Sequence, residues 1–495
     1  MKTKPFLALL AVCSIPLLAL TSRADDFNAV QNGNWSDPNT WVDNTVVTNG
    51  TVPGAADSAD IPSGITVTVD TNEYIGFVYD SGSLIMGTNS SLNIFSDSSI
   101  ATSINLIATN YGNTVIYSCN PYFAREINYY NLVLANTNWT GFSPPYTVYE
   151  FFNNWSQFGP TPMNIAGDLT LMGYVRFEQG TDGPGVSSDV TIGGNLNIGT
   201  YCAYDSSGAN LLVSSNVYVY GCLDDGNAAL GSSTIGGNVL VYGPTNNTPN
   251  YKGGYYTNGW HISDVTNWFV GGSLTNNGAI YGAGFGSISF NGAGVITGSN
   301  ALTIPTMTVN GTYAIADTIT LTTNTPTLNG TLVFDLARTN QIILKYSNTG
   351  TNAQTTQTNY YSGNLIITNT GSAPASGNSY KFFSASNYAG TFTAINYPPL
   401  AAGLSWTNNL LLNGSIAVTG VALGSPILTI TRSGLALTLT WDSNTYPGFS
   451  VQAQTNSAGI HPNSNWFPTG SGKVSPYPTT INPAGPPVFY RLSNQ

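Results

Sequence analysis

A short phrase recurs through the middle of this chain and constrains its fold more than any other feature. Each copy is a turn signal rich in Gly, Ser or Asn followed by alternating apolar and polar residues, which predicts a short strand with one buried face. The copies are 165–171 (IAGDLTL), 192–198 (IGGNLNI), 214–219 (SSNVYV), 235–241 (IGGNVLV) and 270–274 (VGGSL). Self-similarity at intervals of 21 to 35 residues predicts a solenoid, in which stacked copies bury faces that one copy cannot bury alone.

Alignment of the copies predicts which residues stack. The first apolar column contains Leu169, Leu196, Val217, Val239 and Leu274, and the second contains Leu171, Ile198, Val219 and Val241. Aliphatic residues in register on stacked strands indicate a parallel β-helix, so we expect an all-β chain: a right-handed parallel β-helix followed by a small β-sandwich. A polar column precedes the first apolar one, and we interpret its Asn195, Asn216 and Asn238 as an amide ladder that bonds successive turns.

Composition favours a secreted protein over a cytosolic enzyme. Charged residues make up 7% of the 495 residues, whereas about a quarter is usual in soluble domains. Residues 1–24 have the features of a signal peptide: Lys2 and Lys4, an apolar run over 6–20, and a small-x-small site that ends at Ala24. The apolar run is too short for a transmembrane helix, and we expect no transmembrane segment elsewhere. We therefore predict a secreted, extracellular or cell-surface location, with the periplasm as an alternative.

Charge argues against one class of partner. Cleavage after Ala24 would remove three basic residues and no acid, which changes the formal net charge from −11 to −14. An acidic surface with few lysines is a poor match for a polyanion, so we expect no nucleic-acid partner.

The rest of the chain divides around the repeats. We expect the β-helix to span 25–418, with Trp35 and Trp41 as a cap over its first rung. Aromatic insertions interrupt it near 139–162 and 250–261, a linker covers 419–426, and 427–495 form the sandwich with Trp441 in its core.

Two stretches resemble a known class of proteins. Residues 33–70 carry a W-x-x-x-x-x-W stretch followed by VPG and IPSGITVTV, and residues 330–418 carry L-x-F-D-L, Y-x-F-F, Y-x-G-x-F, G-L-x-W and G-x-I-x-V in that order. This order resembles secreted bacterial proteins with autotransporter-associated β-strand repeats, which are passenger-type β-helices. The tail resembles the short immunoglobulin-like or fibronectin-like modules of such proteins. The resemblance implies a secreted solenoid and does not imply a reaction.

Two of the cysteines are one repeat apart. Cys202 and Cys222 are separated by 20 residues, so they could stack on adjacent rungs. A disulfide and a pair of buried thiols are equally compatible with this spacing in an oxidising compartment.

Residues with catalytic chemistry are sparse. Arg176 and Glu178 share one face of a predicted strand, with Asp182 close behind, and Asp224-Asp225 form a second acidic group. We interpret the first group as a solvated ion pair beside a turn and the second as a turn without the spacing of a calcium loop. We therefore predict no catalytic residue, no metal site and no cofactor.

Binding is the remaining possibility. Tyr255, Tyr256 and Trp260 lie in the second insertion, where aromatic rings could stack on a neutral glycan, and the alternative is that they pack between rungs. We expect a non-catalytic secreted scaffold or adhesin-like protein that binds an extracellular glycan or another cell-surface component; the alternative is a polysaccharide lyase or glycoside hydrolase.

Overall fold

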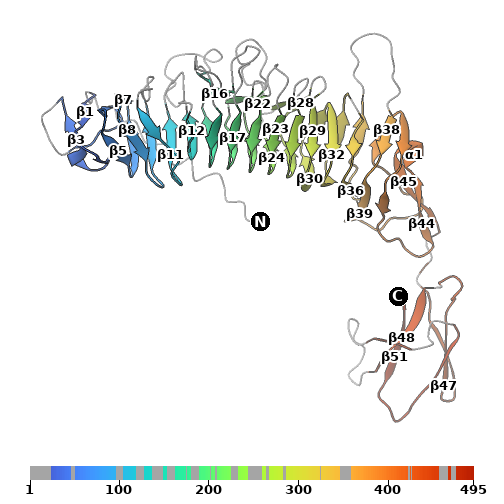
Figure 1. Ribbon diagram of the computed structural model, residues 1–495. Helices are drawn as coiled ribbons and strands as arrows, with labels where there is room; N and C mark the ends of the chain where they lie inside the picture. Colours follow the sequence, from blue (N-terminus) through green and yellow to red (C-terminus); the bar gives the residue numbers. More distant parts are fainter. Residues whose placement is uncertain are drawn as a thin grey trace, which may run out of the picture.

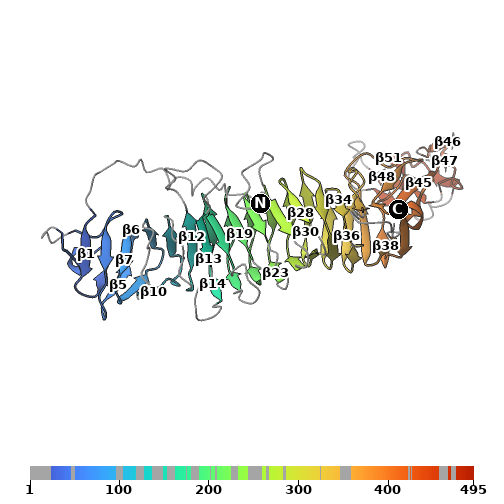
Figure 2. The ribbon, with the colours of Figure 1, turned by 90° about the horizontal axis from the view of Figure 1, so that it is seen from above.

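The computed structural model contains a long parallel β-helix followed by a small antiparallel module (Figure 1). It describes residues 24–494 except for 46–50, 96–103, 119–126, 136–148, 153–161, 174, 180–188, 201, 207–208, 225–231, 243–258, 263–266, 283–285, 324, 346–357, 422–423, 425, 447, 456–465 and 470–474. The rungs follow one another along a single axis in both views (Figures 1 and 2).

Three parallel sheets form the body of the helix. The long sheet contains β6 (Asn72–Ile75), β9 (Ser91–Ile94), β11 (Thr114–Tyr117), β12 (Asn131–Ala135), β15 (Leu169–Met172), β18 (Leu196–Ile198), β21 (Val217–Val219), β24 (Val239–Val241), β27 (Leu274–Asn276), β30 (Ala293–Gly298), β33 (Thr312–Ile315), β36 (Thr331–Asp335), β39 (Asn364–Thr368) and β43 (Ala394–Asn396). The eight-stranded sheet contains β14 (Met163–Ile165), β17 (Val190–Ile192), β20 (Leu211–Val213), β23 (Ser232–Ile235), β26 (Asn267–Val270), β29 (Ser287–Phe290), β32 (Thr306–Val309) and β35 (Thr327–Leu328). The six-stranded sheet contains β13 (Tyr149–Phe152), β16 (Val175–Glu178), β19 (Ala203–Asp205), β22 (Cys222–Asp224), β25 (Gly259–Ile262) and β28 (Ile280–Gly282). Consecutive strands such as β17, β18 and β19 belong to three different sheets, so one rung contributes a strand to each.

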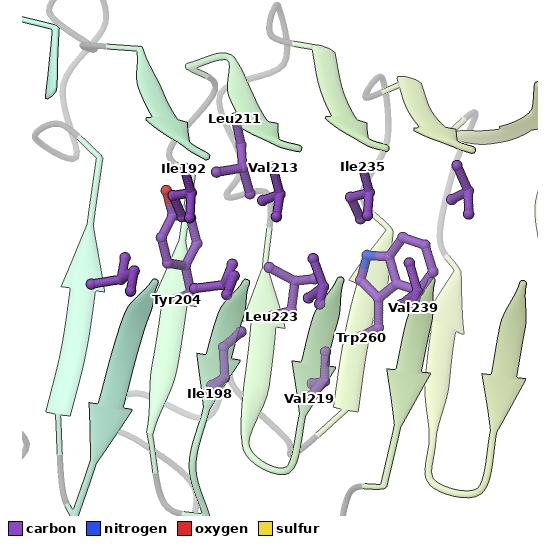
Figure 3. Close-up of a cluster of buried hydrophobic side chains, with 14 of the residues drawn as sticks. Ile192, Ile198, Tyr204, Leu211, Val213, Val219, Leu223, Ile235, Val239 and Trp260 are labelled. Atoms are coloured by element: carbon purple, nitrogen blue, oxygen red, sulfur yellow. The ribbon is translucent and has the colours of Figure 1, made fainter. Parts of the chain in front are cut away.

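The predicted register is confirmed. Leu169, Leu196, Val217, Val239 and Leu274 are successive Cα partners in the long sheet, and all five are fully buried. The second column, Leu171, Ile198, Val219 and Val241, pairs and is buried in the same way. The core is therefore a continuous stack of aliphatic and aromatic side chains between the sheets (Figure 3).

The amide ladder is also present. The side-chain oxygen at this position accepts the backbone N–H of the corresponding residue on the next rung: Asp168 from Asn195 at 2.7 Å, Asn195 from Asn216 at 3.1 Å, and Asn216 from Asn238 at 2.9 Å. Asn238 accepts in turn from the backbone of Ser273 at 2.7 Å. These bonds satisfy turn N–H groups that the β-ladder does not reach.

Glycine beside this ladder lets neighbouring turns approach closely. A Cβ atom added to Gly237 would lie 2.6 Å from the carbonyl oxygen of Ser215 and 2.7 Å from Oδ1 of Asn216. We expect Gly237→Ala to lower the free energy of unfolding by about 1–3 kcal/mol, because the turns must separate. Gly54→Ala is the control, since its Cβ would meet only Asp57 Oδ2 at 3.4 Å. Chemical denaturation measures both variants, and equal stability losses would contradict the steric argument.

The N-terminal end is closed as expected. Trp35 and Trp41 are buried, their ring centroids are 4.9 Å apart, and Nε1 of Trp41 donates to the Trp35 carbonyl at 2.9 Å. The strands of this end are β1 (Asp26–Ala29), β2 (Gly33–Asn34), β3 (Trp41–Asp43), β4 (Ser58–Asp60), β5 (Thr66–Val69), β7 (Phe77–Tyr79), β8 (Ser83–Met86) and β10 (Asn105–Ile107), with the 3-10 turn η2 (Pro38–Thr40).

The C-terminal end differs from a simple continuation of rungs. Parallel stacking continues through β31 (Leu302–Ile304), β34 (Ile319–Leu321), β37 (Ile342–Leu344) and β41 (Phe383–Ser384), and through the pair β38 (Thr358–Tyr361) and β42 (Asn387–Gly390). The chain reverses at the short helix α1 (Leu410–Asn413), which lies between β44 (Leu404–Asn409) and β45 (Ser415–Gly420). These two strands and β40 (Ser379–Lys381) form an antiparallel sheet. Gly414 allows this reversal with a φ of 76°, and the antiparallel sheet closes the last rung.

The tail consists of two three-stranded antiparallel sheets. One contains β46 (Thr429–Ser433), β47 (Ala436–Thr440) and β50 (Tyr477–Thr480), and the other contains β48 (Phe449–Thr455), β49 (Phe467–Pro468) and β51 (Val488–Asn494). Trp441 is buried as expected, together with Leu439 and Val451. In the part of the chain that the structure describes, no helix is both long and apolar enough to cross a membrane.

Candidate functional site

The six-stranded sheet has an aromatic inner face. Five core residues are successive partners across β16, β19, β22, β25 and β28: Phe177, Tyr204, Leu223, Trp260 and Ile280. Figure 3 shows Tyr204, Leu223 and Trp260 pointing into the core. Strand alternation therefore places their neighbours on the outer face. The candidate functional site is this outer face.

Trp260 is part of the hydrophobic core. Its side chain is fully buried and meets the ring of Trp268 edge-on, with centroids 5.1 Å apart. The insertion near 250–261 ends earlier than expected, because Gly259–Ile262 already form β25 and alternation directs Trp260 inward. The Trp260 ring therefore packs in the core, which was the alternative to glycan binding expected for it. Tyr255 and Tyr256 lie outside the described residues, as do most residues of the insertion near 139–162, so their role in glycan binding stays a prediction.

The outer face gathers charged residues that are far apart in the sequence. Glu178, Asp205 and Asp224 are successive partners on β16, β19 and β22. The Arg176 guanidinium donates to the Asp205 carboxylate at 2.7 Å. Arg176, Asp205 and Asp224 are 8%, 1% and 8% exposed, so the expectation of a solvated ion pair at Arg176 is wrong. Arg176 is buried because its guanidinium bonds Asp205 on the next rung instead of an acid in its own segment.

Sequence reasoning missed Asp205, although a signal for it exists. Glu178 follows Asp168 by ten residues, and Asp205 follows Asn195 by ten, so the two acids occupy one column of the repeat. Arg176 and Asp205 are 29 residues apart, so no pattern of charged residues close together in the sequence contains both. Asp182 and Asp225 lie outside the described residues.

An aromatic pair continues the acidic row. His261 follows Trp260, the partner of Leu223, and so it lies next along the row from Asp224. The His261 ring stacks on Tyr281 with centroids 4.7 Å apart and an interplanar angle of 25°. Tyr281 is 45% exposed. This pair therefore presents an accessible ring next to the buried carboxylates of Asp205 and Asp224.

The two cysteines are not joined by a disulfide, although both are buried. Cα pairing joins Cys222 to Ala203 rather than to Cys202, so the cysteines are offset by one residue. An offset of one directs side chains to opposite faces of a sheet, and Cys202 accordingly packs in the core with Tyr204. Burial raises the pKa of the Cys202 thiol to about 12, which keeps it protonated and unreactive.

Among the residues that the structure describes, no group of three or more His, Cys, Asp and Glu side chains is placed to hold a metal ion. Comparison of the chain with protein-family models, with curated proteins and with solved structures finds no match. The residues of this face that carry chemistry are a buried ion pair, a neighbouring carboxylate and an exposed tyrosine ring.

Proposed function

We propose that the chain is a secreted, non-catalytic scaffold of the adhesin-like type that binds neutral carbohydrate on the outer face of its six-stranded sheet. The observation that carries this proposal is the His261–Tyr281 stack with its exposed tyrosine ring. Tyrosine offers a flat apolar face with a polar edge, which suits a sugar ring.

Three further features support the proposal. The features of a signal peptide in residues 1–24 agree with an extracellular location. The resemblance of 33–70 and 330–418 to autotransporter-associated β-strand repeat proteins agrees with a surface scaffold. Finally, the acids of the outer face disfavour a polyanionic glycan, since like charges repel across an interface.

The proposal predicts the result of Tyr281→Ala. We expect this variant of the protein without residues 1–24 to bind a neutral oligosaccharide roughly threefold to tenfold more weakly than the parent, because one ring–sugar contact is lost. A glycan array identifies the ligand, and calorimetry with that ligand measures the affinity.

Tyr360→Ala is the matched control, since Tyr360 is 57% exposed on β38 and belongs to another part of the helix. Absence of glycan binding by the parent protein would refute the proposal. Equal affinity losses in both variants would show that Tyr281 is not the specific binding site, although the proposal of glycan binding would stand.

One observation favours a second candidate function, which is glycan cleavage. Asp205 and Asp224 are direct partners on adjacent strands, and glycosidases work through pairs of carboxyl groups. If the chain cleaves glycans, the parent protein should release reducing ends from a polysaccharide. Asp224→Asn should then slow that release by roughly a hundredfold or more. No release of reducing ends across a panel of neutral polysaccharides would exclude it for those substrates.

A further inference from the structure

The sheet of β46, β47 and β50 in the tail has two edges. β46 and β47 are joined by a two-residue turn, with Ser433 opposite Ala436. In such a hairpin the flanking pair is hydrogen-bonded, so alternate residues of β46 bond to β47 and the others do not. Ile430 and Arg432 therefore direct their backbone N–H and C=O groups away from the sheet.

The β50 edge is blocked by proline. Residues of β47 that bond to β50 are Leu437 and Leu439, whose partners are Thr479 and Tyr477. The alternate residues of β50, Pro478 and Thr480, consequently face the open edge. Proline has no N–H group and cannot donate to a further strand, which makes it a common protection for an edge.

The β46 edge has no such protection. Every residue of β46 is exposed, and Ile430 is 52% exposed with Ile427 at 81% just before it. The strand contains neither proline nor lysine, and its one charged side chain is turned back, since Nε of Arg432 donates to the Gly434 carbonyl at 2.8 Å. An exposed edge with apolar residues is a template for another strand.

The sequence of β46 complements itself. Antiparallel pairing of two copies centred on Thr431 would place Ile430 of each copy opposite Arg432 of the other, so the residues with outward N–H and C=O groups meet. Thr429 would lie opposite Ser433, and hydroxyl pairs of this kind stabilise a sheet. The two Arg432 side chains would not be directly opposite each other, so no like charges are placed in register.

We propose that β46 is a dimerisation edge, at which a second copy of this chain adds its own β46 to make a continuous six-stranded sheet with two-fold symmetry. The arrangement is closed, because each copy uses the same edge. A contact of one short strand is small, so the dimer is weak and concentration-dependent.

Ile430→Pro tests this directly, because it gives β46 the protection that Pro478 gives β50 while leaving the hydrogen bonds to β47 in place. Analytical ultracentrifugation of the full chain across a dilution series should show a monomer–dimer equilibrium for the parent and only monomer for the variant. Thr480→Pro is the matched control, since it makes the same change at the other edge, and it should dimerise like the parent.

Ile430→Lys provides a second variant that retains the backbone N–H and should also weaken the dimer. Circular dichroism shows whether each variant is folded. A parent that stays monomeric at its highest soluble concentration overturns the proposal, as does a dimer that both folded Ile430 variants leave unchanged.

Discussion

Val217→Asp should unfold the middle of the β-helix. Val217 is fully buried between Leu196 and Val239 in the long sheet, so the new carboxylate would be buried without a partner. Burial of an unpaired charge is among the most costly single changes, and we expect the free energy of unfolding to fall by about 4 kcal/mol or more. Because each rung contacts only its neighbours, the loss should be concentrated in β18, β21 and β24.

Hydrogen exchange measured on peptides that contain these strands provides the test. Tyr218→Asp is the control, since Tyr218 is on the same strand but half-buried on the outer face. It should cost no more than about 1 kcal/mol. Similar loss of protection in both variants would mean that the register of the long sheet is wrong.

Arg176→Ala should destabilise the protein strongly, although arginine is a residue type that usually lies on the surface. Its ion pair with Asp205 has a 2.7 Å contact, and the two side chains are 9% and 2% exposed. Removal of the arginine takes away the positive charge that faces a buried carboxylate, and loss of one partner of a buried ion pair costs about 3–5 kcal/mol in comparable sites. Thermal and denaturant unfolding measure the effect.

The double variant Arg176→Met/Asp205→Leu separates two causes of that loss. Apolar replacement of a whole buried ion pair is often neutral or stabilising, so the double variant should recover most of the lost stability. If it is as unstable as Arg176→Ala, the cost lies in the lost packing of the arginine side chain rather than in the loss of its positive charge.

Periodicity alone predicted the parts of this fold that repeat. The Leu196, Val217 and Val239 column and the Asn195, Asn216 and Asn238 ladder both follow from residues at corresponding positions of successive copies. Each rung buries the same face with the same residue types, so one copy of the repeat predicts the buried positions of the next. The tryptophan cap could also be predicted, because an open first rung needs an apolar cover.

The site was less accessible to the same reasoning. Arg176 and Asp205 lie on adjacent rungs but 29 residues apart in the sequence, and the inward position of Trp260 depends on where β25 begins after an insertion. Insertions shift the register without leaving a periodic signal, and a shift of one residue reverses the face of every side chain that follows. The same offset separates Cys202 from Cys222.

The sequence by itself therefore determined the solenoid, its core columns and the polar ladder between turns, because local alternation and a repeated period specify which faces must be buried. Only the tertiary structure decided which outward residues become neighbours. The acidic row beside Arg176 and the His261–Tyr281 stack depend on pairing between strands of successive rungs. The unprotected β46 edge depends on β50 pairing with β47 and leaving β46 at the edge of the sheet. Pairing between rungs is set by the packing of the whole stack, so no single segment of the sequence shows which outward residues will be neighbours.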